Sequence, residues 1–363
     1  MKRPRTVLVR VDGSDRIGMG HVMRCLALAE GLRREGGRPV FVTKSDEPRV
    51  MDVLRGNGFD VESVPAEVDF EREARIVSDA ASRYASGVFV TDLSHAGTID
   101  AIPAFGRYLR QLKAAGLFVV MLDGGTPLDC VCLQEEVDAD VIVMPYFGAQ
   151  EKDYQRRVGQ QFLLGPAYFL FREELLKAAA GPKDIKEKVE NVLVNMGGDS
   201  YNLTLRVARA LKSMNRELNV RVLLGSACPA LREQDIRQVL SGKGTRYEII
   251  RTGDHVAELM HWADLAVISS GLTKYETAFI GTPSLVIARD DYEGWKENGF
   301  EAEGLCVFLG QERDFTEETF QEAVEKIMND VPWRRALSAR GKKCFDGKGT
   351  TRILEAIPGE LWR

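Results

Sequence analysis

The sequence has little of what nucleic-acid-binding and membrane proteins need. Its 49 lysine and arginine residues are outnumbered by 54 aspartate and glutamate residues, which gives a formal net charge of −5. Binding nucleic-acid phosphates or an anionic membrane surface takes a basic excess, which this chain lacks. No apolar run reaches the roughly 18 to 20 residues of a membrane span, and a strand-like run stands where a signal peptide has its apolar core. We therefore expect a cytoplasmic protein with no nucleic-acid and no membrane partner.

The sequence also lacks the spacing of a metal site. Its six cysteines are scattered, mostly in apolar surroundings, as is typical of reduced and buried thiols. Cys130 and Cys132 form the one close pair, but they have neither the two-residue gap nor the second pair of a zinc site. The four histidines are widely separated. We expect no metal and no cofactor.

What the sequence does contain is an alternation of two patterns. Apolar β-branched runs alternate with segments of helical periodicity from residue 7 to residue 144, lapse between residues 145 and 181, and resume from residue 191. At 363 residues, with 44% hydrophobic and 28% charged residues, the chain is long enough for two globular domains. The alternation predicts an α/β fold with two doubly wound parallel sheets, each of the Rossmann-like type.

The lapse sets the expected domain boundaries. We place an N-terminal domain at residues 1–150, an interdomain passage at 151–185 and a C-terminal domain at 186–345. A C-terminal helix at 346–363 is expected to pack back on the N-terminal domain.

The most informative stretch runs from Val7 to Gly31. An apolar run ends at Asp12, a turn punctuated by Gly18 and Gly20 follows, and a helical segment begins with His21. Parallel sheets bind ligands at such strand-to-helix junctions, and histidine is the side chain most often used for proton transfer near neutral pH. His21 is therefore a candidate general base, although a polar residue in the first turn of a helix is the alternative interpretation.

Two further polar groups follow predicted strands. Asp92-Leu93-Ser94-His95 and Asp123-Gly124-Gly125 would share the rim of His21 if all the strands are parallel. His95 is either a second titrating group in the pocket or a loop histidine. The glycines near His21 do not complete a dinucleotide-binding fingerprint, because Arg24 stands near the position of the third glycine.

The second half carries two glycine-bearing turns between strand and helix. Gly197-Gly198 and Ser269-Ser270-Gly271 would direct backbone N–H groups and helix dipoles at a ligand, which suits a diphosphate without a metal. Strand-to-helix turns also need glycine for steric reasons alone. Glu276 either binds a sugar diol or completes a capping box with Thr273.

With these motifs in view, the chain resembles the UDP-sugar hydrolases of pseudaminic acid biosynthesis and the related spore-coat polysaccharide proteins, a group with the GT-B glycosyltransferase architecture. The resemblance rests on four motifs, spread in the same order over nearly the whole chain: Asp12-Gly13 with Ile17-Gly18-Met19-Gly20-His21-Val22-Met23-Arg24, Gly165-Pro166-Ala167-Tyr168, Met196-Gly197-Gly198-Asp199, and Ser269-Ser270-Gly271-Leu272-Thr273-Lys274-Tyr275-Glu276.

The resemblance implies two domains facing a cleft and a metal-independent, inverting hydrolysis of a UDP-linked amino or deoxy sugar to free sugar and UDP. His21 would activate the water, with Asp12 in the same catalytic pocket. The N-terminal domain would hold the sugar and the C-terminal domain the UDP. The residues expected to bind substrate are Gly18, Gly20, Arg24, Asp92, His95, Gly197, Gly198, Val256, Ser270, Gly271, Thr273, Glu276 and Asn298.

The sequence departs from this family in the loops expected to face sugar and phosphate. Asp92-Leu93-Ser94 stands where the family has Asp-x-Tyr, and Asn298-Gly299 stands where it has Asn-Gln. The sugar therefore stays open. Two alternative functions also stay open: a glycosyltransferase with a sugar or lipid acceptor at the same UDP-sugar site, and a nucleotide-sugar-binding protein without catalysis.

Overall fold

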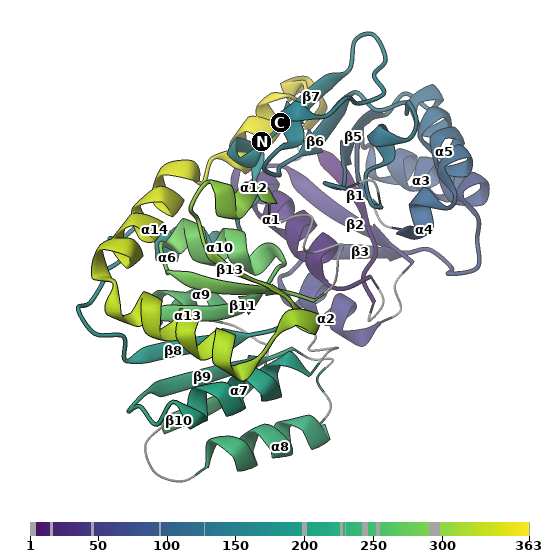
Figure 1. Cartoon of the computed structure of the whole chain (residues 1–363). Coiled ribbons are helices and arrows are strands. Elements are labelled where there is room, and N and C mark those ends of the chain that lie inside the picture. Colours follow the sequence, from purple (N-terminus) through teal and green to yellow (C-terminus); the bar gives the residue numbers. More distant parts are fainter. Residues whose placement is uncertain are drawn as a thin grey trace. The chain divides into compact units, whose positions relative to one another are not determined.

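The structure is a computed structural model. It describes residues 5–14, 17–44, 47–93, 96–126, 128–197, 202–225, 228, 230–241, 246–251, 255–289 and 298–362. Contacts divide the chain into two compact units, Met1–Glu173 with Gly347–Arg363 and Glu174–Asp346. Each unit is built on one parallel sheet (Figure 1).

The first unit contains a seven-stranded sheet in the order β3-β2-β1-β4-β5-β6-β7. Every pairing in it is parallel. Because the order reverses between β1 and β4, the carboxyl ends of these two strands lie side by side at the point where such sheets bind ligands. The strands are β1 (Thr6–Val11), β2 (Arg38–Thr43), β3 (Asp60–Ser63), β4 (Val88–Asp92), β5 (Phe118–Leu122), β6 (Val141–Met144) and β7 (Gln161–Leu164).

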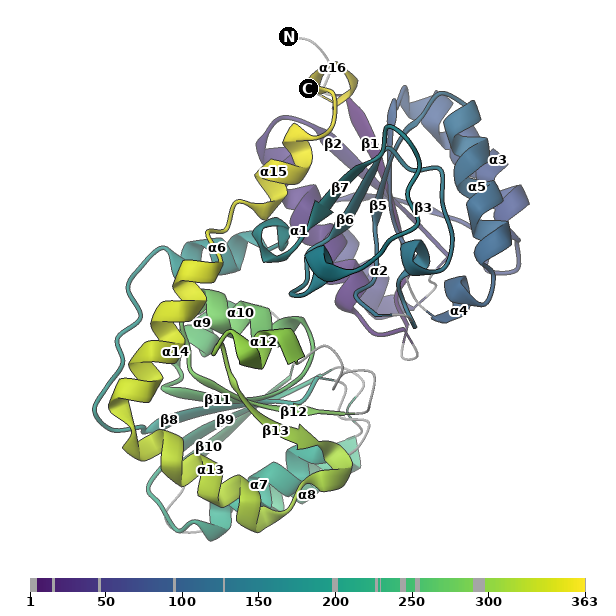
Figure 2. The same cartoon turned by 45° about the horizontal axis from the view of Figure 1, so that its top comes forward.

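Helices cover both faces of this sheet (Figure 2). On one face lie α1 (Gly20–Arg34), α2 (Pro48–Gly56), α15 (Gly349–Glu355) and α16 (Gly359–Trp362), whose apolar residues share a core with the strands. On the other lie α3 (Phe70–Tyr84) and α5 (Ile102–Ala114). Shorter elements of this unit are α4 (Ala96–Ile99), η1 (Val131–Leu133), η2 (Ala149–Glu151) and η3 (Pro166–Tyr168).

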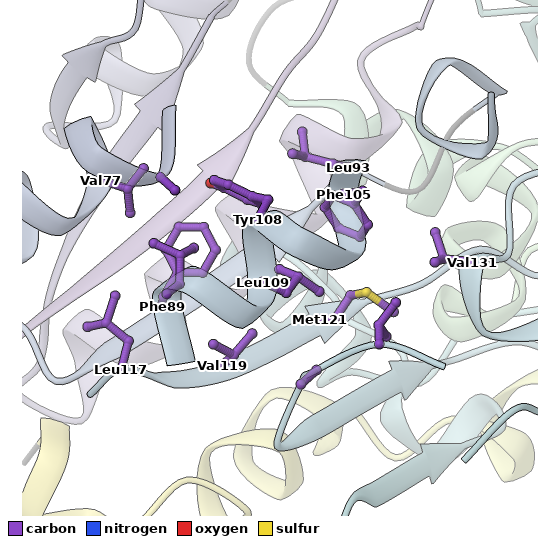
Figure 3. Close-up of a cluster of buried hydrophobic side chains, with 14 of the residues drawn as sticks. Val77, Phe89, Leu93, Phe105, Tyr108, Leu109, Leu117, Val119, Met121 and Val131 are labelled. Atoms are coloured by element: carbon purple, nitrogen blue, oxygen red, sulfur yellow. The ribbon is translucent and has the colours of Figure 1, made fainter. Parts of the chain in front are cut away.

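The two cores follow from the alternation along the strands. Phe89 and Val119 face α5, where they meet Phe105 and Tyr108 (Figure 3). Their neighbours in the sequence point to the α1 face, as Val90 does. Successive side chains of a strand point to opposite faces, so strands buried on both sides are apolar throughout. Continuous apolar runs are what the sequence shows at these strands.

The second unit contains a six-stranded sheet in the order β10-β9-β8-β11-β12-β13, again with every pairing parallel. Its strands are β8 (Asn191–Asn195), β9 (Asn219–Leu224), β10 (Arg246–Arg251), β11 (Leu265–Ser269), β12 (Ser284–Ala288) and β13 (Val307–Gln311). The order reverses between β8 and β11, which places their carboxyl ends side by side.

Two groups of helices cover this second sheet (Figure 2). On one face lie α7 (Leu203–Ser213), α8 (Ala230–Leu240) and α13 (Glu317–Asn329). On the other lie α9 (Val256–Trp262), α10 (Leu272–Ile280) and α14 (Val331–Cys344). The remaining elements are α6 (Glu173–Ala179), which begins at the boundary between the units, α12 (Asn298–Ala302) and η4 (Glu312–Asp314).

The boundaries differ from those expected in one region. Residues 151–185, expected as an interdomain passage, contain β7, which pairs with β6 in the first sheet. The first unit therefore extends to Glu173. β7 gives a weak strand pattern, because its four residues include Gln161 and no β-branched residue. The C-terminal α15 belongs to the first unit and contacts α1 and η3.

None of the helices in the described part of the chain is both long enough and apolar enough to cross a membrane.

Candidate active site

The carboxyl edge of the first sheet brings together side chains from three elements. β4 ends at Asp92, α1 begins one residue before His21, and Tyr146 follows β6 after a single proline. One turn along α1, Arg24 lies on the same face as His21, because residues three apart on a helix are neighbours. These four side chains form one hydrogen-bonded group, which we call the His21 group.

The loop before α1 fixes where His21 stands. The Gly18 N–H donates to the Ser14 carbonyl at 2.7 Å, and Gly18 has a φ of 84°, a conformation that favours glycine. At Gly13 a Cβ atom would lie only 2.8 Å from Cγ2 of Val22, so a larger residue would push the loop away from α1. This packing sets the start of α1 at Gly20 and puts His21 in its first turn.

His21 and Asp92 form the central contact of the site. Nδ1 of His21 lies 2.7 Å from Oδ1 of Asp92. The Asp92 side chain is 0% exposed, whereas that of His21 is 18% exposed and so remains accessible from solvent. Arg24 holds both oxygens of the same carboxylate, with Nε 2.7 Å from Oδ2 and Nη2 2.6 Å from Oδ1.

The electrostatics of Asp92 determine the tautomer of His21. Burial by itself raises the pKa of Asp92, but the charge of Arg24 and the hydrogen bonds from Arg24 and His21 outweigh burial and hold this pKa far below its usual range. Asp92 is therefore ionised and can only accept hydrogen bonds, so Nδ1 of His21 is the donor. In the neutral imidazole Nε2 then carries the lone pair. A carboxylate that fixes the tautomer in this way is the arrangement that general-base histidines use.

Tyr146 connects the His21 group to the loop after β5. Its hydroxyl accepts a hydrogen bond from Nη1 of Arg24. Its ring lies against Gly125, where a Cβ atom would come within 3.0 Å of Cδ2. The loop is folded by Asp123, which accepts backbone hydrogen bonds from Val131 and Cys132 at 2.9 Å each.

Asp12, expected in the catalytic pocket, belongs to a different network. It accepts two hydrogen bonds from Arg10, at 2.5 and 2.8 Å, and one from the Lys44 backbone N–H at 2.8 Å. Burial raises the pKa of Asp12, but Arg10 outweighs burial and lowers the pKa below its usual value. Arg10 also donates to Glu73 of α3 at 2.6 Å. These contacts tie the ends of β1 and β2 to α3, a structural task.

In the second unit, several expected site residues lie at the carboxyl ends of the neighbouring strands β8 and β11. Gly197, with a φ of 62°, follows β8 and donates its N–H to Oδ1 of Asn195 at 3.0 Å. Ser270 is buried after β11, and Gly271 precedes α10. Val256 is the first residue of α9.

The start of α10 corrects one alternative. The helix begins at Leu272, so Thr273 is its second residue and cannot be the N-cap of a capping box with Glu276. The capping-box interpretation is therefore wrong. Glu276 is nonetheless buried, as is Lys274, whose Nζ lies 3.5 Å from Oγ of Ser270.

Two expected residues, His95 and Gly198, lie outside the described part of the chain, and so does the side chain of Asn298, the first residue of α12. Among the described residues, no three histidine, cysteine, aspartate or glutamate side chains group as a metal site.

Sequence reasoning missed Tyr146 and Lys274. Tyr146 could have been found by the rule that identified Asp92, since it follows the next-but-one strand at the same edge of the sheet. Lys274 gave no such signal, because the sequence pattern does not distinguish a buried lysine in the first turn of a helix from an exposed one.

The chain has recognisable relatives of known sequence. No protein-family model matches it. It is 28% identical over 360 residues to the uncharacterized protein MJ1062 of Methanocaldococcus jannaschii, a match that covers 97% of this chain but 66% of that protein, so the chain spans about two thirds of this relative's length. It is 23% identical over 354 residues to the spore coat polysaccharide biosynthesis protein SpsG of Bacillus subtilis, covering 95% and 96% of the two chains.

Solved structures resemble the chain over its whole length. MurG of Acinetobacter baumannii matches with a TM-score of 0.66 at 13% identity, covering 98% of this chain and 99% of its own. The UDP-GlcNAc 2-epimerase of Neisseria meningitidis, solved bound to UDP-GlcNAc, matches with a TM-score of 0.63 at 10% identity, covering 97% and 99%. These likenesses show the fold, two parallel-sheet α/β units of the GT-B type, and so confirm the predicted fold class.

Proposed function

We propose that the chain is an enzyme that hydrolyses a UDP-linked amino or deoxy sugar to free sugar and UDP, without a metal and with inversion. The observation that carries the proposal is the contact between His21 and the buried, ionised Asp92 at the carboxyl edge of the first sheet. It leaves Nε2 as the basic nitrogen of a partly exposed imidazole. The likeness to a spore coat polysaccharide protein and to an epimerase bound to UDP-GlcNAc supports a UDP-sugar as substrate.

The reaction needs one base and one stabilised leaving group. Nε2 of His21 takes a proton from water as the water oxygen bonds to the anomeric carbon. The bond from that carbon to the β-phosphate oxygen breaks, and its electron pair leaves with UDP. Attack opposite the leaving group inverts the anomeric configuration. Such general-base help is worth about 10² to 10⁴ in rate.

The second unit is proposed to hold the UDP. Gly197, Gly198, Ser270, Gly271 and Thr273 would surround the diphosphate, where backbone N–H groups and the start of α10 favour negative charge. Glu276 would bind the ribose hydroxyls, Val256 would lie near the uracil, and Asn298 would contact the substrate. In the first unit, Gly18, Gly20 and His95 would surround the sugar. Arg24 and Asp92, expected as substrate-binding residues, have their side chains engaged with each other.

The test is UDP release without any acceptor, from a panel of UDP-sugars that includes the 2,4-diacetamido-2,4,6-trideoxy-altrose nucleotide, in ¹⁸O-labelled water. We expect the label in the free sugar and none in UDP, with the inverted anomer seen first by NMR. His21→Asn should lower release by about 10² to 10⁴. The matched control is His261→Asn, at the other end of α9 from Val256.

Three outcomes would contradict the proposal. Label in UDP would mean that water attacks phosphorus. Turnover only when a sugar or lipid acceptor is added would indicate a transferase. Tight UDP binding with no release from any member of the panel, with or without an acceptor, would indicate a binding protein.

A further inference from the structure

We propose that Arg24 is a positioning residue that fixes and neutralises Asp92, the carboxylate that orients the His21 ring. The effect that this role of Arg24 has on turnover rests on the proposed function. The effect of Arg24 on the imidazole of His21 does not rest on that function and can be measured without any substrate.

The geometry directs Arg24 at the protein and away from a ligand. The residue is 4% exposed. All three of its guanidinium nitrogens donate to protein groups: Nε and Nη2 to the two oxygens of Asp92, and Nη1 to the hydroxyl of Tyr146. A planar guanidinium held by a carboxylate in two places has its orientation fixed, and the carboxylate is fixed with it.

The charges explain why a second partner for Asp92 matters. A buried carboxylate 2.7 Å from an imidazole, acting alone, favours the imidazolium form, which cannot accept a proton from water. Arg24 brings a positive charge to the same carboxylate, and its Nη2 lies 3.4 Å from Nδ1 of His21. Together Asp92 and Arg24 carry no net charge, so the ring of His21 is oriented by a neutralised carboxylate.

The other titratable groups around this pair do not replace Arg24. Sγ of Cys25 lies 3.8 Å from Oδ2 of Asp92, and burial raises the pKa of this thiol, so it is neutral. The carboxylate of Asp129 interacts with Arg24 and adds negative charge. Tyr146 contributes a neutral hydroxyl. Within the described part of the chain, Arg24 is thus the cation that faces Asp92.

Tyr146 fixes Arg24 in turn. Its hydroxyl accepts from Nη1, its ring lies 5.7 Å from the Arg24 Cζ, and Gly125 leaves the space that the ring occupies. The phenol therefore holds the guanidinium nitrogen that Asp92 does not bind, without adding charge. Removing the hydroxyl alone should loosen Arg24 and keep the charges as they are.

The experiment measures, as a function of pH, the rate at which diethyl pyrocarbonate modifies His21. This reagent reacts with an imidazole only when the ring is uncharged. Peptide mass spectrometry reports each histidine separately, and His255, whose side chain is 69% exposed, is the internal reference. In Arg24→Met the midpoint for His21 should move about one unit to higher pH, because Asp92 is no longer neutralised. In Asp92→Asn it should move to lower pH, because Arg24 remains.

Two conservative variants separate charge from geometry. Arg24→Lys and Tyr146→Phe keep the charges, so the midpoint should stay within about 0.3 unit of the wild-type value while kcat falls several-fold. They also serve if Arg24→Met fails to fold. In Arg24→Met, the acid limb of the kcat profile should move with the midpoint, and activity should recover at higher pH.

An unchanged midpoint in folded Arg24→Met, or a rise in KM with kcat and midpoint preserved, would overturn the inference and make Arg24 a substrate-binding residue. A raised KM with an unchanged kcat in Arg24→Lys and Tyr146→Phe would also overturn the inference. Opposite midpoint shifts in Arg24→Met and Asp92→Asn, found in a protein that releases no UDP from any sugar, would support the inference while the proposed function fails.

Discussion

Arg10 and Glu73 are 63 residues apart in the sequence and form a fully buried ion pair, with Nε of the arginine 2.6 Å from Oε1 of the glutamate. Glu73 also accepts one hydrogen bond from Tyr108 and forms an ion pair with Lys44. The network joins β1, α3, α5 and the residue that follows β2. Removing one partner of such a buried pair destabilises the fold, because the other partner is left as an uncompensated buried charge.

The first prediction follows from that relationship. Glu73→Gln should lower the free energy of unfolding of the first unit by about 3 to 5 kcal/mol, because Arg10 and Lys44 lose the charge that compensates them. The measurement is urea unfolding. Its control is Glu71→Gln on the same helix, where an exposed pair with Arg75 should change stability by less than about 1 kcal/mol. Equal effects in the two variants would show that the buried network is not what stabilises this unit.

The second prediction concerns acid. Burial raises the pKa values of three carboxylates in the first unit, but nearby arginines outweigh burial. Arg10 lowers the pKa values of Asp12 and Glu73 below their ordinary values of 3.8 and 4.5, and Arg24 lowers that of Asp92. A group whose pKa is lower in the folded state contributes stability above its unfolded-state pKa, and this stability is lost as the pH falls. The first unit should therefore lose stability steadily below about pH 4.5.

Amide hydrogen exchange of β1 and β4 at pH 6, 5, 4 and 3 measures this loss. In Glu73→Gln the stability should fall less steeply with acid than in the wild type, because one of the three carboxylates no longer takes up a proton. A slope equal to that of the wild type would mean that Glu73 does not titrate with a lowered pKa.

A third prediction uses two helical glycines that differ in their surroundings. A Cβ atom on Gly341 of α14 would overlap the carbonyl of Ala278 in α10, whereas one on Gly106 of α5 would meet nothing within 4 Å. Gly341→Ala should therefore destabilise the second unit by about 1 to 3 kcal/mol through overpacking. Gly106→Ala should stabilise the first unit by about 0.5 to 1 kcal/mol, since alanine is the better helix former. Thermal unfolding of both variants tests the pair, and a stabilising Gly341→Ala would contradict the close packing of α10 and α14.

The fold was predictable from the sequence because both of its signals are local. The apolar runs at Val7–Val9 and Val88–Val90 carry no polar interruption, as strands buried on both faces require, and helical periodicity fills the gaps. β7 was missed because its four residues include Gln161 and no β-branched residue, whereas three of the four residues of the equally short β6 are β-branched. The capping box at Thr273, one of two alternatives for Glu276, was wrong because helix caps depend on backbone angles that residue types only suggest.

The sequence predicted which side chains meet at the edge of the first sheet better than it predicted their contacts. The rule that ligands bind at the carboxyl ends of parallel strands identified His21 and Asp92 and applies equally to Tyr146. It could not show that the side chain of Arg24 contacts Asp92. A charged residue on a helix is usually expected to be exposed, and only the packing of α1 beside β4 shows that this one is buried. Nor could it show that Asp12 is engaged by Arg10, two residues earlier on the same strand.

The last prediction separates these two aspartates by their effect on turnover. In Asp92→Asn, the imidazole loses the carboxylate that fixes its tautomer, so kcat for UDP release should fall by about 10² or more while UDP binding, measured by calorimetry, stays within a few-fold. Asp12→Asn should mainly lower stability, because its carboxylate binds Arg10 and the backbone of Lys44. Asp60→Asn, an exposed ion-pair variant, is the control for both. If folded Asp12→Asn loses as much turnover as Asp92→Asn, Asp12 returns to the catalytic set, and if Asp92→Asn keeps its turnover, His21 does not depend on a carboxylate partner.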